Sequence, residues 1–369
     1  MKKLFSLALV VSTAALVNSV FAFAKYVDIT TTYTGGDVTD FPVLVKITST
    51  TPTGFYSDVK NAGADLKFTD ASGAGDYPYE IDTWNASGDS YIWVKLPKLS
   101  AGMTFRMYYG DEEQTAQTTK PTDVWTGYDL VCHVNDASDS TINNVEGKLN
   151  PDATSKTDGA VGKTYGTDST AGAALANRIY TSGSTGFLPN GTFSYSFWFR
   201  PNAAVAMFAS LVGPRNASNA DTWGIHTYNP VTMIYVSTAQ NKSTIVNLSD
   251  AFEVGEWHKI DVTMNGEEVS FFLNGTQVGQ TSKTGSAPMN CWVQWMGWGG
   301  LISDNAPKFS SANSLVADFD ECRIFSTVAD AARVAADYQT VANVATFLSF
   351  SDPHGEVVVE VLPQGVIFK

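Results

Sequence analysis

The feature that most constrains the fold of this chain is a long succession of short strand-like runs, each closed by Gly, Pro, Asp or Asn. The runs are rich in β-branched and aromatic residues, which is typical of strands. Examples are residues 41–48, 91–96, 193–200 and 257–264. Asn274-Gly275 directly follows such a run and predicts a type I′ hairpin, because both central positions of that turn need a positive φ. The pattern predicts an all-β protein.

The runs fall into two blocks, which predicts two domains. A polar stretch without apolar periodicity, residues 112–126, separates the blocks and is predicted to be a linker. Residues 25–111 and residues 127–345 are each long enough to bury a core of their own. We therefore predict two tandem β-sandwiches.

The end of the chain predicts one helix and one hairpin. Apolar residues recur with helical spacing after Thr327, a suitable N-cap, so the second domain is predicted to close with a short helix. Residues 346–369 are predicted to form a β-hairpin tail around Pro363-Gln364. Such a tail can pack on its own domain, or it can self-associate with a second copy by adding a strand, and both alternatives stay open.

The first 24 residues predict a secretory signal peptide. Lys2-Lys3 precede an apolar stretch, and Ala22-Phe23-Ala24 forms an A-x-A cleavage box before Lys25. The apolar stretch is short and interrupted by Ser and Thr, whereas a membrane span needs about 20 apolar residues. We therefore expect cleavage after Ala24 and a mature chain that is secreted, periplasmic or on the cell surface, without a transmembrane anchor.

The charge of the chain argues against a nucleic-acid partner. The 23 basic and 37 acidic residues give a net charge of −14. Loss of Lys2 and Lys3 with the leader leaves 21 basic residues against 37 acidic ones, a net charge of −16. Nucleic-acid binding depends on Lys and Arg neutralising phosphates, so we expect none here.

Three cysteines are too few for a disulfide scaffold. Cys291 and Cys322 each lie in an apolar, strand-like run, and export would permit a disulfide between them. The alternative is that all three thiols are buried and reduced. Cys132 is predicted to be an inert core residue.

The first block resembles a bacterial extracellular domain of unknown function that commonly precedes laminin-G-like modules. The resemblance lies in residues 63–70 (GADLKFTD), 78–84 (PYEIDTW), 92–97 (IWVKLP) and 107–110 (MYYG), in the order typical of that family. It implies a fold but no activity.

The second block resembles a laminin-G-like, concanavalin A-type jelly roll. The matching pieces are residues 131–136 (VCHVND), 193–201 (FSYSFWFRP), 257–263 (WHKIDVT) and 319–325 (FDECRIF). The family usually has Trp where this chain has Cys132. The resemblance implies a fold that hosts lectins, glycosidases and structural modules alike.

Calcium is the one cofactor that this resemblance implies. Jelly rolls of this type often bind a structural ion between the first and last strands, and the matching residues are Asn135, Asp136, Asp139 and Asp320. Such oxygen donors suit Ca²⁺. The alternative is that Asp136 and Asp139 cap turns through their own hydrogen bonds.

No catalytic constellation is readable in the sequence. Glucanases of this fold use E-x-D-x-x-E, and the nearest stretch, residues 80–85 (EIDTWN), has Asn in place of the second Glu. We therefore predict that Glu80 and Asp82 form a solvated or hydrogen-bonded strand face. The histidines lie in no nucleophile elbow and in no zinc motif. The sequence predicts a protein that is not an enzyme.

Aromatic residues are the candidate carbohydrate-binding groups, because sugar rings stack on aromatic faces. In an extended strand, Trp292, Gln294 and Trp298 share one face. Trp223 and Tyr228 lie in a run that is expected to be a neighbouring strand. The alternative is that these rings fill the core of the sandwich.

These observations predict an exported, non-catalytic bacterial protein that binds glycan or acts in surface adhesion. Two alternatives stay open. One is a glycoside hydrolase whose acids are too scattered to be read from the sequence. The other is a structural envelope protein that assembles with copies of itself.

Overall fold

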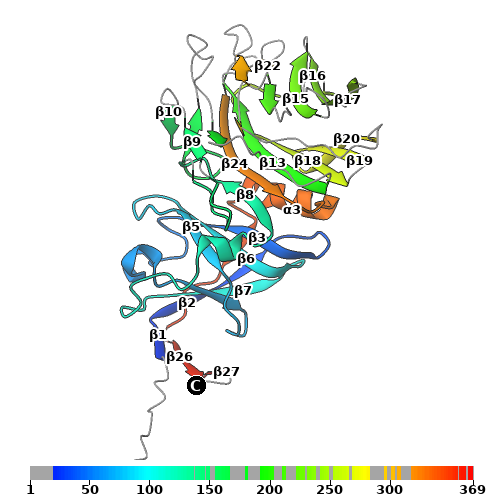
Figure 1. Cartoon of the computed structure of the whole chain (residues 1–369). Helices are drawn as coiled ribbons and strands as arrows, with labels where there is room; N and C mark the ends of the chain where they lie inside the picture. The colour runs from blue at the N-terminus through cyan, green and yellow to red at the C-terminus, as the bar shows by residue number, and fades with distance from the viewer. Residues whose placement is uncertain are drawn as a thin grey trace, which may run out of the picture.

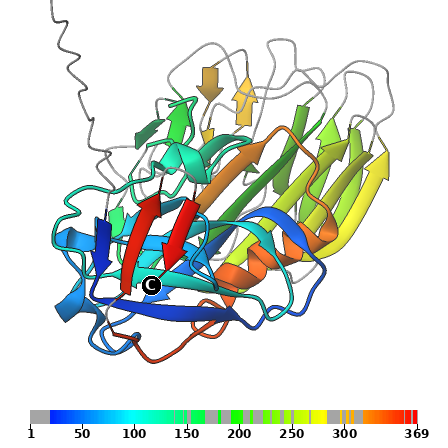
Figure 2. The ribbon, with the colours of Figure 1, turned by 90° about the horizontal axis from the view of Figure 1, so that it is seen from below.

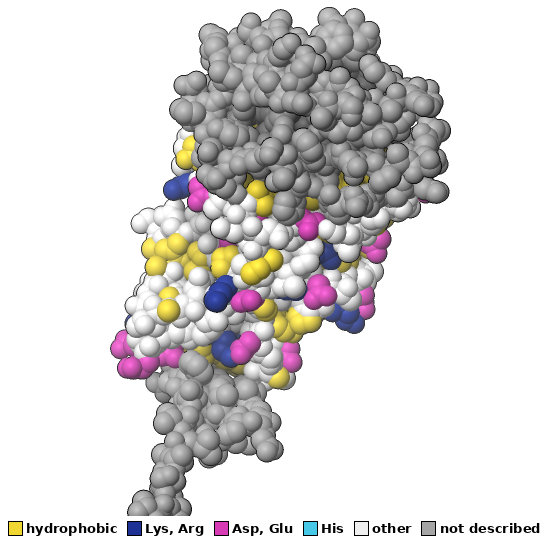
Figure 3. Space-filling model, in the orientation of Figure 1, with side chains coloured by type: hydrophobic (Ala, Val, Ile, Leu, Met, Phe, Trp, Pro, Cys, Tyr) yellow, Lys and Arg dark blue, Asp and Glu magenta, His cyan; other side chains and the backbone are white. Residues whose placement is uncertain are grey.

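The computed structural model describes the following residues: 20–136, 138–145, 147–149, 154–166, 179–181, 192–202, 210–212, 222–228, 231–237, 242–248, 252–265, 268–282, 295–296, 301–303, 306–308, 317–355, 357–362 and 365–368. Within 203–251, within 281–316 and beyond 355 it describes the backbone of strands only. Figure 1 shows two β-rich lobes, one above the other, with the helix α3 (Ala331–Ala342) between them. In the space-filling view of Figure 3, Lys and Arg side chains lie interspersed with Asp and Glu on the described surface. The predicted all-β architecture with a short C-terminal helix is confirmed.

The first domain is a sandwich of two antiparallel sheets. Its core lies between them and includes Val43, Val94, Phe105 and Met107, all fully buried. In residues 27–30 apolar and polar residues alternate, so one face of the strand lies toward the core. Residues 41–45 and 92–94 are buried throughout, so their strands bury both faces. One sheet has the order β25 (Leu348–Phe350), β2 (Lys25–Thr31), β7 (Thr104–Tyr109), β4 (Lys67–Asp70), and the other β3 (Val38–Ile47), β6 (Ser90–Leu99), β5 (Tyr79–Thr83).

The C-terminal part of the chain returns to the first domain and completes it. Leu348 of β25 pairs with Thr31 of β2, and Phe347 is buried in the first core. Helix α3 contributes Ala336 to that core, and Thr340 Oγ1 accepts a hydrogen bond from the amide of Leu44 at 2.9 Å. The second domain is therefore inserted into the first. The predicted boundary after residue 345 is wrong, because the apolar residues just beyond it are buried in the first domain.

The predicted linker, residues 112–126, is also wrong as a linker. The segment packs on the first domain, where Gln114 Nε2 donates to the carbonyl of Ala64 at 2.7 Å. It forms the short helix α2 (Pro121–Val124), and Trp125 directly after it is 1% exposed. Gln114 and Thr119 donate hydrogen bonds to carbonyl groups of the first domain, while most of the other polar residues of the segment are exposed.

The second domain is built on one large antiparallel sheet. Its core includes Phe197, Val262, Phe271 and Ile324, all buried. The predicted turn at Asn274-Gly275 is present, with φ values of 49° and 78°, and joins β19 to β20. The strand order is β10 (Thr154–Lys156), β11 (Thr164–Gly166), β24 (Ala317–Phe325), β13 (Thr192–Pro201), β18 (His258–Asn265), β19 (Glu268–Leu273), β20 (Thr276–Ser282), with β8 (Tyr128–Cys132) also on β24.

Smaller sheets accompany the large one. A four-stranded sheet contains β14 (Ser210–Val212), β15 (Thr222–Tyr228), β16 (Val231–Ser237) and β17 (Lys242–Leu248). A three-stranded sheet contains β21 (Trp295–Met296), β12 (Ile179–Thr181) and β9 (Gly147–Leu149), and a pair contains β22 (Leu301–Ser303) and β23 (Ala306–Lys308).

The predicted C-terminal hairpin is present as β26 (Val357–Leu362) and β27 (Gly365–Phe368). Its strand β26 pairs with β1 (Val20–Phe23), and Figure 2 shows these three strands side by side. Strand β1 belongs to the predicted signal peptide, so cleavage after Ala24 would remove it from β26. No helix of the described part of the chain is long and apolar enough to cross a bilayer.

The cysteine predictions have different outcomes. Cys132 on β8 is buried, and burial raises the pKa of its thiol to about 12, which fits an inert core residue. Cys322 on β24 is also buried and lies directly opposite Cys132. Cys291 lies outside the described residues, so its disulfide with Cys322 stays a prediction.

Candidate functional site at the domain junction

An apolar cluster joins the two domains. Leu44 and Trp93 from the first domain pack with Trp198 and Phe272 from the second, and all four are buried. Trp125 lies between the domains, with its ring centroid 5.6 Å from that of Trp93 in an edge-to-face arrangement. Burial of these large side chains makes the junction a packed core, so the two domains share one fixed orientation.

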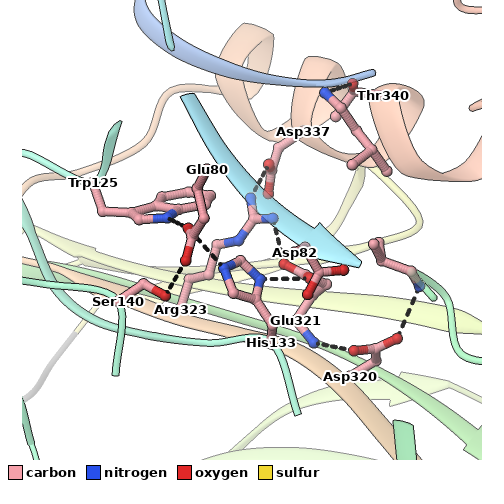
Figure 4. Close-up of polar contacts among 12 residues, drawn as sticks. Glu80, Asp82, Trp125, His133, Ser140, Asp320, Glu321, Arg323, Asp337 and Thr340 are labelled. Atoms are coloured by element: carbon pink, nitrogen blue, oxygen red, sulfur yellow. Dashed lines mark hydrogen bonds and ion pairs between the residues drawn. The ribbon is translucent and has the colours of Figure 1, made fainter. Parts of the chain in front are cut away.

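A buried histidine links carboxylates from the two domains. His133 follows β8, and its Nε2 lies 3.1 Å from Glu80 Oε2 on β5 of the first domain. Its Nδ1 lies 2.8 Å from Glu321 Oε1 on β24. Figure 4 shows the imidazole between the two carboxylates. Burial lowers the pKa of His133, but Glu321 and Glu80 outweigh it and hold the pKa well above its usual value.

Glu80 is fixed by further donors. Trp125 Nε1 and Ser140 Oγ both donate to its carboxylate, the latter at 2.7 Å. Burial raises the pKa of Glu80, but the charge and hydrogen bond of His133 together with these two donors hold it below its usual value. Glu80 is therefore a buried, hydrogen-bonded anion and not a solvated one.

The charged network continues to the helix. Arg323 donates from Nη2 to Glu321 at 2.6 Å and from Nη1 to Asp337 of α3 at 2.7 Å. Lys259 Nζ lies 2.9 Å from Asp337 Oδ2. The guanidinium of Arg323 also lies 4.2 Å from the ring centroid of Trp93. Each of these buried charges has an opposite charge beside it, which offsets the cost of removing it from water.

Two residues of the junction have an unusual backbone. Glu321 has a φ of 48° in the middle of β24, and Val134, next to His133, has a φ of 57°. Positive φ is costly for a side chain with a Cβ, and most costly for a β-branched one such as valine. The register of β13 with β24 shifts between Ser196 and Trp198, opposite Glu321, so this is a bulge. Such strain and bulges concentrate at functional sites.

A pocket of about 700 Å³ opens beside this buried network. It lies between β5 and β6 of the first domain and two segments of the second, one after β8 and one between β10 and β11. Trp84 and Tyr91, both half-buried, contribute aromatic surface. The lining residues are Asp82, Thr83, Trp84, Asn85, Gly88, Asp89, Tyr91, Asn135, Asp136, Thr157, Gly162 and Lys163.

Asp82 connects the pocket to the buried network. Its Oδ1 accepts a hydrogen bond from Asn135 Nδ2 at 2.5 Å, and the register of β5 shifts between Ile81 and Thr83, around Asp82 itself. Burial raises the pKa of Asp82 to about 7; His133 lowers it, and the nearby Glu321 and Glu80 raise it further. At neutral pH this carboxyl therefore holds its proton part of the time.

Close approach of the second domain to Asp82 depends on a glycine. Gly162 has a φ of 56°, and a Cβ at this position would lie 2.5 Å from Thr83 Oγ1 and 3.5 Å from Asp82 Oδ2. A side chain here would both strain the backbone and push the two domains apart. Glycine at 162 therefore keeps this side of the pocket closed.

The role of the predicted carbohydrate-binding residues stays untested by the described part of the chain. Trp292, Gln294 and Trp298 lie outside the described residues. Trp223 and Tyr228 lie on β15, as the predicted strand requires, but their side chains are outside the described part of the chain. Their role stays a prediction.

The predicted calcium ligands have other partners. Asp139 is buried and accepts hydrogen bonds from the amides of Val131 and Val145. Asp136 is exposed and accepts from Ser138, as in the turn-capping alternative. Asp320 accepts from two backbone amides, and Asn135 binds Asp82. Within the described ranges no group of three or more His, Cys, Asp or Glu residues could hold a metal ion. Asp136 and Asp139 thus have the hydrogen bonds of the turn-capping alternative, and the calcium site stays a prediction.

Sequence reasoning missed the junction as a site. It treated Glu80 and Asp82 as an ordinary strand face and gave His133 no role. One signal was available: the stretch 80–84 combines two carboxylates and a tryptophan, and a histidine lies in the apolar run 130–134. Their meeting depends on the contact between the domains, which no local pattern contains.

Two family models match the chain. Residues 62–148 match a domain of unknown function, DUF2341, and residues 166–335 match the concanavalin A-like lectin/glucanases superfamily. The chain thus contains these two domains in the order that the sequence predicted. No curated protein matches it.

Solved structures share parts of the fold at low identity. The binding domain of Paraclostridial Mosquitocidal Protein 1 is 15% identical with a TM-score of 0.44, and covers 59% of this chain and 53% of its own. The Botulinum Neurotoxin serotype G binding domain is 13% identical with a TM-score of 0.42, and covers 57% of this chain and 50% of its own. The chain thus spans about half the length of these structures. At these scores the likeness does not bear on function.

Proposed function

We propose that this chain is an exported, non-catalytic protein that binds carbohydrate in the pocket between its two domains. The observation that carries the proposal is the composition of the pocket. It places the aromatic rings of Trp84 and Tyr91 beside the polar side chains of Asp82, Asn85 and Asn135. Sugars have both an apolar ring face and a rim of hydroxyl groups, and such a lining suits both.

The size of the pocket and the concanavalin A-like domain support the proposal. About 700 Å³ lies within the range of small-molecule sites, which bury most of their ligand. The superfamily that matches residues 166–335 is named for lectins, which bind carbohydrate, and for glucanases, which hydrolyse it. Fold alone does not choose between these functions.

Hydrolysis is the second candidate function, and Asp82 is the observation that favours it. A general acid needs a raised pKa, and Asp82 lines the pocket with a pKa of about 7. A glycosidase also needs a second carboxylate that acts on the same bond. Two buried carboxylates that act on the pKa of Asp82, Glu80 and Glu321, are each bonded to His133. A third that interacts with it, Asp320, accepts from two backbone amides, so each of the three already has hydrogen-bond partners within the fold. This arrangement supports binding over hydrolysis.

The proposal is tested by presenting the purified mature chain to a panel of polysaccharides, with retention and release of reducing sugar measured together. We expect the chain to be retained on at least one polysaccharide without release of reducing sugar. Release of reducing sugar that is lost in Asp82→Asn would establish the hydrolase instead. Failure to retain any polysaccharide would refute carbohydrate binding.

The location of the site is tested by filling the pocket. Thr157 is exposed and lines it, so Thr157→Trp should obstruct the pocket without disturbing a core. Thr154 is also exposed on the same segment but is not one of the lining residues, so Thr154→Trp is the matched control. We expect the first variant to lose retention and the second to keep it. Retention by both would place the carbohydrate site elsewhere, such as the predicted aromatic residues of β15.

A further inference from the structure

Asp82 differs from Glu321 and Asp337 in the charge of its partners. Glu321 is paired with both His133 and Arg323, and Asp337 with both Lys259 and Arg323. Asp82, in contrast, accepts hydrogen bonds from the Asn135 amide and the Thr83 hydroxyl, which are neutral. Asp320 also has neutral partners, two backbone amides, but it is not one of the residues that line the pocket. His133 lies near enough to influence Asp82, but both of its ring nitrogens are bonded to the other two carboxylates.

The chain holds this carboxylate in place at a cost. A partly buried carboxylate with neutral partners loses more in desolvation than its hydrogen bonds return. The bulge at Asp82, the positive φ of Gly162 beside it and the strained Val134 and Glu321 all lie around it. A costly arrangement of this kind at a pocket indicates a functional role.

The other charges of the pocket also favour a cation. Asp136 and Asp89 carry further carboxylates, although Asp89 is paired with Lys46 at 2.8 Å. One lysine among the described lining residues, Lys163, opposes the three acids. The mature chain would add a long-range field of the same sign, since its net charge is negative. Uronic, sialic and sulfated sugars would be repelled.

We infer that the pocket selects a sugar that carries an amine, and that Asp82 is the specificity-determining residue that receives the ammonium group. This inference rests on the proposed carbohydrate binding. An ammonium on the bound sugar donates a charge-assisted hydrogen bond to Asp82 Oδ2 or Oδ1 and supplies the positive partner that the chain does not. The rings of Trp84 and Tyr91 bind the apolar part of the same ligand.

The test compares three oligosaccharides of equal length with the full mature chain at pH 7 in the presence of EDTA. They are oligomers of glucosamine, N-acetylglucosamine and galacturonic acid, which are cationic, neutral and anionic. We expect the cationic oligomer to bind about tenfold more tightly than the neutral one, as the loss of one charged hydrogen bond predicts. Asp82→Asn should abolish this preference and leave the neutral oligomer unaffected. Asp352→Asn removes the same charge from an exposed position outside the pocket and should keep the preference.

The outcomes separate the inference from the proposed function. Equal binding of the cationic and neutral oligomers, or a preference that survives in Asp82→Asn, refutes the amine while carbohydrate binding stands. Absence of binding by all three, together with absence of retention on the polysaccharide panel, refutes both. If calcium abolishes binding of the cationic oligomer and sodium at equal ionic strength does not, a metal ion is the partner of Asp82. That result also overturns the inference.

Discussion

Replacement of Asp82 by asparagine should stabilise this protein, and only above about pH 4. The carboxyl has a pKa of about 7 in the folded chain against an ordinary value of 3.8. Below pH 3.8 it is protonated in both states and costs nothing. Between the two values the unfolded chain has released the proton and the folded chain has kept it, so the free energy of unfolding falls as pH rises. Above about pH 7 the loss is complete.

The magnitude follows from the difference between the two pKa values. A difference of one in pKa corresponds to about 1.4 kcal/mol, so the folded state loses about 4 kcal/mol above pH 7. Asparagine keeps the Oδ1 acceptor for Asn135 and cannot ionise, so Asp82→Asn should recover that amount. In a chain of this length, 4 kcal/mol raises Tm by roughly 5 °C. At pH 4 the variant and the parent should melt together.

The assay is thermal unfolding followed by circular dichroism from pH 4 to pH 9, with Asp136→Asn as the matched control. Asp136 lines the same pocket but is exposed, and asparagine keeps its hydrogen-bond acceptor for Ser138. The control should therefore change Tm little at any pH. An Asp82→Asn variant that is no more stable than the parent at pH 8, or that follows the same pH profile, would refute the account of the buried carboxylate.

Four further predictions follow from the structure. His133→Ala leaves Glu80 and Glu321 buried without their cation, so it should lower the free energy of unfolding by about 3–5 kcal/mol in urea titrations. Because the pKa of His133 is raised, its stabilising contribution is complete below pH 6.5 and is lost as pH rises through the raised value. A destabilisation by His133→Ala that is largest at high pH would contradict this. Because Asp139 and Asp320 bind backbone amides, EDTA should leave Tm unchanged, and a fall that calcium reverses would show that the predicted ion exists. N-terminal sequencing of the exported product should begin at Lys25, and a product that retains Val20 would contradict cleavage after Ala24. If removal of β1 leaves β26 open to a second copy, light scattering of the mature chain should show a mass that grows with concentration, whereas a chain lacking residues 356–369 should remain monomeric; equal masses would refute self-association through the hairpin.

The sequence predicted the local structure well, because local structure depends on local patterns. Short runs of β-branched and aromatic residues predicted the strands, and Asn274-Gly275 predicted its hairpin turn. The helical spacing after Thr327 predicted α3, although the observed N-cap is Asp330 and not Thr327. The domain boundaries were wrong for a physical reason. Phe347 is buried by residues of the first domain that lie hundreds of positions earlier in the chain, and Trp125 is buried where the two domains meet. The composition of the segments that contain these residues does not describe the surfaces that cover them.

The site was less predictable than the fold. Glu80 and His133 have unremarkable sequence neighbours, and their pairing exists only where the two sandwiches meet. The pocket has the same origin, since its lining comes from both domains. The strained φ of Val134 and Glu321 left no trace in residue type, because neither is a glycine or an asparagine. Features that arise from contact between domains require the structure.

The return of the chain to its first domain has a consequence for biosynthesis. Ser351 accepts a hydrogen bond from the amide of Asp28, 323 positions earlier. The sheet that contains β2 therefore cannot be complete until β25 has emerged from the ribosome or the export channel. The inserted jelly roll has its own core and can fold during this interval, while β2 keeps an unpaired edge. Such distant pairings slow folding, so the first domain, although synthesised first, is expected to be the last to reach its native state.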